Sequence, residues 1–367
     1  MHRSALMMVT IGALLVGALG CTTSTADYAG MVYYIYGPEG ALDVIRSHSA
    51  APDEQPLVEL ERAMALLELG SYRRSNQALS AAALVFEADA AYGRNPSTAR
   101  PLWRPEAHER VLMTTLRVVN FLALQDLAKA AEAADRTVDR IDEADCRDCD
   151  WLFSRVVSAI AYDGVGRWRD GLEVLEPVTA SGDAGELLDA LRAELSVGAA
   201  GRQPAGLAPP PVATDRELVV LVLLGRGPFK ERAKLQIGPD QRIRWCRYAP
   251  RAPQATGAAA VELPDAETPV PSIELSDVES LAEASLDARA ERMRAAGVPG
   301  DEATTGDLRH WASLPASLGI IRVEVPSGVD RADLVILSPD GDEVDRETLV
   351  WSDGWTGGRL FVVRRVP

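Results

Sequence analysis

The sequence predicts an α+β protein, in which a solenoid of α-helical hairpins is followed by a mostly antiparallel β domain with one helix. Apolar residues recur at three- and four-residue steps through residues 31–202, as they do on one face of a helix. The stretch QPAGLAPPPVATD then predicts a linker over residues 203–215. Beyond it, β-branched runs end at Pro-Ser-Gly, Pro-Asp-Gly and Gly-Gly turns, so residues 216–367 are expected to be β-rich.

An uncharged, mostly apolar run occupies residues 5–19 and ends shortly before Cys21. A helix of about fifteen residues is roughly 22 Å long, short of a ~30 Å hydrocarbon core, which is typical of a secretory signal peptide. The end of this run resembles a bacterial lipobox, with the leucine and the small residue in reversed order. The resemblance implies removal of residues 1–20 and acylation of Cys21, and the polar stretch after it predicts a tether over residues 21–30. An ordinary signal peptide cut nearby is the alternative.

The compartment follows from this segment and from the charge. Thr22 rather than Asp follows the cysteine, which by the lipoprotein sorting rule favours the outer membrane, facing the periplasm. The formal net charge of −16 repels phosphate backbones, so a nucleic-acid partner is not expected. We expect a cell-envelope protein that is held to the membrane by its lipid anchor.

The helical part repeats one pattern three times: an apolar helix, a turn and an alanine-rich helix. The turns are expected at Gly70, at Gln125-Asp126 and at Gly166. Small residues let two helices approach closely, and the pattern resembles a tetratricopeptide hairpin. The turns are unequally spaced, so the repeats are degenerate, and an irregular helical bundle is the alternative.

The second part predicts a small sandwich or half-barrel. The run ELVVLVLLGRG is expected to be a buried strand, with RAKLQIG and RIRWCRYAP as its partners. One helix follows, and Ser276 and Glu279 have the spacing of a capping box at its start. Three later strands are expected in GIIRVEVPSG, ADLVILSPDG and GRLFVVRRV. In the first of these, alternation predicts a solvent-exposed face that contains Ile320, Arg322 and Glu324.

Cys146 and Cys149 form a C-x-x-C pair between helical segments. In an oxidising envelope we expect a local disulfide, with two free thiols or a redox role as alternatives. A zinc site needs four ligands, and the sequence has no second C-x-x-C and no paired histidines. The acidic loop SPDGDEVDRE lacks the spacing of calcium ligands and predicts a hairpin turn. The sequence contains no nucleophile elbow, P-loop or H-E-x-x-H motif. We therefore predict no catalytic residue, cofactor or metal site, and no enzymatic activity.

The stretch DLRHWASLP begins at Asp307 and includes Arg309, Trp311, Leu314 and Pro315. It resembles the D-L-R-x-W-x-x-L-P signature of a family of uncharacterised bacterial lipoproteins. The resemblance implies a lipobox, a tetratricopeptide-like N-terminal half and a β-rich C-terminal half, and it points to envelope maintenance without naming an activity. Physically, the stretch predicts a structural clasp, in which Arg309 bonds a carboxylate while Trp311 packs beneath. The alternative is a ligand pocket in which Arg309 binds an acidic group.

From these expectations we predict that the protein is a scaffold, which binds other envelope proteins or peptides through its helices. Its role is expected to be in envelope or peptidoglycan maintenance. One alternative is a ligand-binding or enzymatic module in the β half. Another is a component of a secretion or surface assembly.

Overall fold

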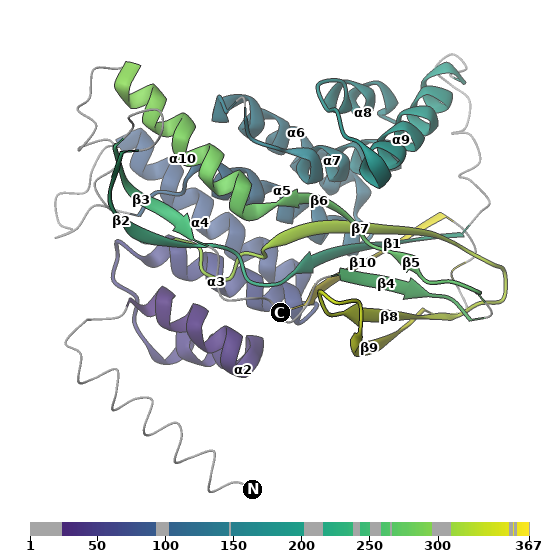
Figure 1. Cartoon of the computed structure of the whole chain (residues 1–367), viewed down its shortest axis with the longest axis horizontal. Helices are drawn as coiled ribbons and strands as arrows, with labels where there is room; N and C mark the ends of the chain where they lie inside the picture. The colour runs from purple at the N-terminus through teal and green to yellow at the C-terminus, as the bar shows by residue number, and fades with distance from the viewer. Residues whose placement is uncertain are drawn as a thin grey trace, which may run out of the picture.

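The structure is a computed structural model that describes residues 24–92, 103–146, 148–201, 216–237, 243–249, 258–264, 266–295, 310–351, 355 and 358–366. A helical half and a β half lie against each other (Figure 1). The predicted signal peptide and the predicted linker fall outside the described residues.

The N-terminal half consists of helices that stack in pairs. Helix α3 packs on α4, α5 on α6, and α7 on α8, which confirms the predicted fold of helical hairpins. The helices of this half are α2 (Thr25–Ser47), α3 (Gln55–Glu68), α4 (Tyr72–Tyr92), α5 (Ala107–Ala123), α6 (Leu127–Ala144), α7 (Leu152–Gly164), α8 (Trp168–Leu175) and α9 (Gly182–Ala200).

Each of the three hairpins turns at a residue in the left-handed backbone region. The φ angle is 67° at Gly70, 57° at Gln125 and 72° at Gly166. The N–H of this residue and the next N–H both donate back to carbonyls of the preceding helix, as Gly70 does to Leu67 at 2.9 Å. The three turns share this pattern, so the pairs are structural repeats despite their unequal spacing.

The predicted polar tether is wrong over residues 25–30, because α2 already begins at Thr25. Ser24 caps the helix by accepting a hydrogen bond from the Asp27 N–H at 3.0 Å. Ala26 and Ala29 are fully buried, since small side chains allow the helix to lie close to its neighbours. A kink at Gly37 then divides α2 into two helical segments.

The described residues of the β half form two four-stranded sheets and a hairpin. One sheet has the order β10-β1-β7-β6, the other β5-β4-β8-β9, and β2 pairs with β3. All these pairings are antiparallel except that of β1 with β10, in agreement with the predicted mostly antiparallel domain. The elements are β1 (Arg216–Leu224), β2 (Phe229–Ile237), β3 (Ile243–Ala249), β4 (Ala258–Glu262), β5 (Val270–Pro271), β6 (Ile273–Asp277), α10 (Val278–Ala295), β7 (Ser317–Val325), β8 (Arg331–Leu337), β9 (Glu343–Val350) and β10 (Gly358–Val366).

Strand β1 is the centre of three layers. Leu218, Val220 and Val222 face the sheet of β4 and β8, while Val219 and Leu221 face the helices. Both faces are therefore buried, which explains the unbroken apolar run of this strand. The helical half and the first sheet consequently share one hydrophobic core.

Three local predictions for the β half need correction. The partners of β1 are β7 and β10, whereas β2 and β3 pair with each other. Helix α10 is capped by Asp277, which accepts from the Glu279 N–H at 3.1 Å, because the Ser276 hydroxyl accepts from the N–H of Phe153. The face of β7 predicted to meet solvent is covered at Ile320, which is fully buried, because the helices pack over it.

Candidate functional site

The two halves meet at a segment of irregular backbone that we call the clasp segment (residues 310–316). It precedes β7 and contains Trp311, Leu314 and Pro315 of the predicted signature, all three buried. Asp307 and Arg309 of that signature lie outside the described residues. The main chain of the clasp segment is bonded on one side to helices and on the other to strand ends.

On the helical side, two buried carboxylates accept main-chain N–H groups. Glu109 of α5 accepts from the Trp311 N–H at 2.9 Å, and Glu61 of α3 accepts from the Ala312 and Ser313 N–H groups at 2.7 and 3.3 Å. Glu61, Glu109 and Trp311 are each about 1% exposed. A carboxyl group without access to solvent needs such donors, so these bonds offset the cost of burying it.

On the sheet side, the carbonyls of the same segment are the acceptors. The Leu314 carbonyl accepts from the Gly227 N–H at 2.7 Å and from Arg365 Nη2 at 3.3 Å. From the helical side, the Tyr34 hydroxyl of α2 also donates to a carbonyl of this segment, that of Ala312, at 2.8 Å. The clasp segment is therefore hydrogen-bonded to both halves, and Trp311 packs in the core that they share.

A cluster of charged groups lies beside this segment. Glu106 pairs with Lys230 of β2 at 2.9 Å and with Arg289 of α10 at 2.6 Å. Burial opposes ionisation of Glu106, but these two cations hold its pKa below the usual value. Glu106 directly precedes α5, so the pairs join the start of this helix to the strand hairpin and to α10.

Two residues near Glu106, His108 and Glu109, have pKa values far from their usual ones. Burial raises the pKa of Glu109 to about 7, against the opposing effect of Lys230 and of the two N–H groups bonded to it. Burial lowers the pKa of His108 to about 3, so its imidazole is neutral at pH 7.

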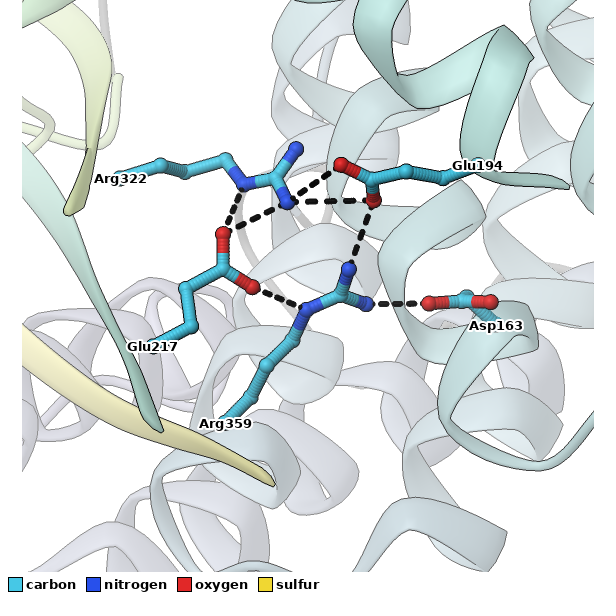
Figure 2. Close-up of polar contacts among 5 residues, drawn as sticks. All are labelled: Asp163, Glu194, Glu217, Arg322 and Arg359. Carbon is cyan, nitrogen blue, oxygen red and sulfur yellow. Dashed lines mark hydrogen bonds and ion pairs between the residues drawn. The ribbon is translucent and has the colours of Figure 1, made fainter. Parts of the chain in front are cut away.

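A second polar link between the halves is the five-residue network in Figure 2. Arg322 of β7 contacts Glu217 of β1 at 2.6 Å and Glu194 of α9 at 2.9 Å. Arg359 of β10 contacts the same two carboxylates and also Asp163 of α7. Arg322 was predicted to face solvent, but it pairs with a carboxylate of the helical half.

The other predicted site residues are three cysteines. Cys146 and Cys149 are joined by a disulfide after α6, with their Cα atoms 5.4 Å apart. The described side chains include no group of three or more His, Cys, Asp or Glu residues arranged to hold a metal ion. Cys21 lies outside the described residues, and no helix among the described ones is long and apolar enough to cross a membrane.

A hollow of about 300 Å³ lies beside the clasp segment, between α2 and the turn after β1. Met31, Tyr34 and Ile35 form one wall, and Arg226 lies with its guanidinium 4.4 Å from the centre of the Tyr34 ring. Asp27 and the first residues of the clasp segment complete the lining.

Sequence reasoning found Trp311 but missed Glu61, Glu109, Tyr34 and Arg365. A glutamate on an apolar helix face was the available signal, since Glu61 follows Leu57 by four residues and precedes Met64 by three. Its partner lies 251 residues away in the chain, so local periodicity could not connect the two.

No protein-family model matches the chain, and no curated protein matches it. Among solved structures, one titled MamA AMB-1 is similar to this chain at 12% identity, with a TM-score of 0.30. The match covers 49% of this chain and 92% of that chain.

Proposed function

We propose that this chain is a lipid-anchored protein of the bacterial cell envelope whose stacked helix pairs act as a scaffold for protein partners. The anchor is supported by the apolar run of residues 5–19 and by the lipobox-like residues before Cys21. The resemblance of the DLRHWASLP stretch to a lipoprotein family supports the same location and a role in envelope maintenance.

The observation that carries the scaffold proposal is the way the helices hold the clasp segment. Glu61 and Glu109 belong to the first helices of two successive hairpins, and both bind main-chain N–H groups of a non-helical stretch. Main-chain recognition of this kind does not depend on the side chains of the bound stretch. Stacked helix pairs with such groups are suited to binding polypeptide.

The surface for a partner lies on the outer helices. The β half packs on α3, α5, α7 and α9, so these helices are covered by the chain itself. Helices α4 and α6 carry exposed side chains such as Arg73 and Glu132. We expect partners to contact α4, α6 and α8.

The scaffold proposal is tested by photo-crosslinking in intact cells. The photoreactive residue p-benzoylphenylalanine replaces Arg73 of α4 or Glu132 of α6, and Val344 of β9 serves as an exposed control position. We expect discrete protein adducts from the helical positions and none from the control. If both helical positions yield no adduct, or only the pattern seen at Val344, the outer helices are not the scaffold surface.

The anchor is tested separately by metabolic labelling with a fatty acid. The wild-type chain should incorporate label and fractionate with membranes, whereas Cys21→Ser should lose both properties, because acyl chains provide most of the membrane affinity. Unlabelled wild-type protein would refute the anchor while leaving the crosslinking result intact.

A further inference from the structure

The first segment of α2 exposes three large apolar side chains. Met31, Ile35 and Tyr36 are 41%, 60% and 56% exposed. Among the side chains whose exposure the structure describes, no other six-residue stretch has three large hydrophobic residues exposed. We call these three residues the α2 patch, and patches of this kind usually mark a contact surface.

The hollow described above adjoins the α2 patch. Met31 and Ile35 are four residues apart, so they lie on one side of the helix and form its apolar wall. The exposed Arg226 adds a cation, held in place by its contact with the Tyr34 ring and by a 3.2 Å hydrogen bond to the Tyr34 carbonyl. An apolar strip beside an arginine matches the boundary between acyl chains and phosphate groups in a phospholipid layer. Asp27 also lines the hollow, and its charge opposes a strongly anionic surface.

Covalent geometry places the α2 patch close to the proposed anchor. Ser24, which caps α2, follows Cys21 by three residues, and three peptide units span at most about 11 Å. Along the helix, Met31 and Ile35 follow Ser24 by about 10 and 16 Å. An acylated Cys21 at the membrane surface therefore keeps the α2 patch within reach of the same surface.

We propose that the α2 patch rests on the phospholipid bilayer, with its apolar side chains at the acyl boundary and Arg226 at the level of the phosphates. This inference rests on the proposed function, because the anchor is what brings α2 to the membrane. Three side chains bury too little area to hold the protein there alone, so their effect is to fix its orientation. Helix α2 lies at the edge of the helical half in Figure 1, so its contact with a membrane leaves the sheet of β4 and β8 accessible.

The test measures lipid contact at single positions and does not require acylation. The chain from residue 21 onward, with Cys21→Ser and an N-terminal hexahistidine tag, is attached to phosphatidylcholine vesicles that contain a nickel-chelating lipid. The photoreactive residue p-benzoylphenylalanine replaces Met31 or Ile35. Val197 of α9, which is 74% exposed, provides the matched control. Lipid adducts are quantified by mass spectrometry after illumination.

We expect severalfold more lipid adduct at positions 31 and 35 than at position 197. Equal yields at the three positions, or adducts to protein instead of lipid at 31 and 35, would overturn the proposal. Because the tag replaces the acyl group, a negative result here refutes the membrane contact, whereas unlabelled wild-type protein in the fatty-acid experiment refutes the anchor.

Discussion

The protonation state of Glu109 affects the stability of the protein, and the same carboxyl group binds the clasp segment. Its pKa is about 7 in the folded chain and near 4.5 when exposed, so the folded state binds the proton more tightly. This contribution to stability is complete below about pH 4.5 and is lost as the pH rises through 7. His108 acts in the opposite direction, because its lowered pKa makes folding more favourable as the pH rises from about 3 to 6.5.

We predict that Glu109→Gln changes the pH dependence of stability in a defined direction. The variant lacks the titrating group, so its free energy of unfolding relative to wild type should increase by up to about 1.4 kcal/mol per pH unit between about pH 4.5 and 7. Above pH 7 the difference should level off. Urea unfolding at several pH values measures it, with Glu132→Gln on the exposed side of α6 as control. A difference that is constant across this range would contradict the prediction.

Helix α2 is positioned by a close approach to the clasp segment. A Cβ atom on Gly30 would lie 2.7 Å from Cβ of Ala312, closer than packed carbon atoms come. Only glycine therefore allows α2 to lie at its present distance, where Tyr34 can bond the Ala312 carbonyl.

We predict that Gly30→Ala lowers the free energy of unfolding by roughly 1–3 kcal/mol, because α2 or the clasp segment must shift. The matched control is Asp43→Ala in the same helix, where the side chain is exposed and no such shift is required. Urea unfolding measures both variants. A neutral Gly30→Ala would show that α2 moves at little cost.

The elements that depend on local sequence were predictable, and those that depend on distant partners were not. Gly70 and Gly166 identified two hairpin turns because glycine tolerates the left-handed backbone there. Strand β9 was not predicted, because the charged side chains of this edge strand continue the acidic sequence of the preceding loop. The capping box was misplaced by one residue because Ser276 and Asp277 are both good caps, and the Ser276 hydroxyl accepts the Phe153 N–H of α7 instead.

At the scale of the whole molecule, the predicted two folded parts are joined by more than a linker. One hydrophobic core includes residues of α5 and α7 together with residues of β1, β7 and β10. The clasp segment and the network around Arg359 add polar bonds across the same boundary. The sequence suggested a division because its periodicity changes after residue 202, but periodicity reports local structure and not what each face packs against.

We therefore predict that the two halves unfold together. Leu221 is fully buried on the face of β1 toward the helices, so Leu221→Ala should cost about 2–5 kcal/mol and weaken both halves. Hydrogen exchange followed by mass spectrometry separates the two, and exchange in α5 and in β8 should accelerate by similar factors. Val220→Ala removes a contact from the opposite face of the same strand, so in one cooperative unit it should also accelerate exchange in both α5 and β8. If Leu221→Ala accelerated exchange in β8 while α5 kept its wild-type protection, the helical half would be stable on its own. The shared core would then join two independently folding units, because loss of a contact in a cooperative unit raises the opening rate of every element in it.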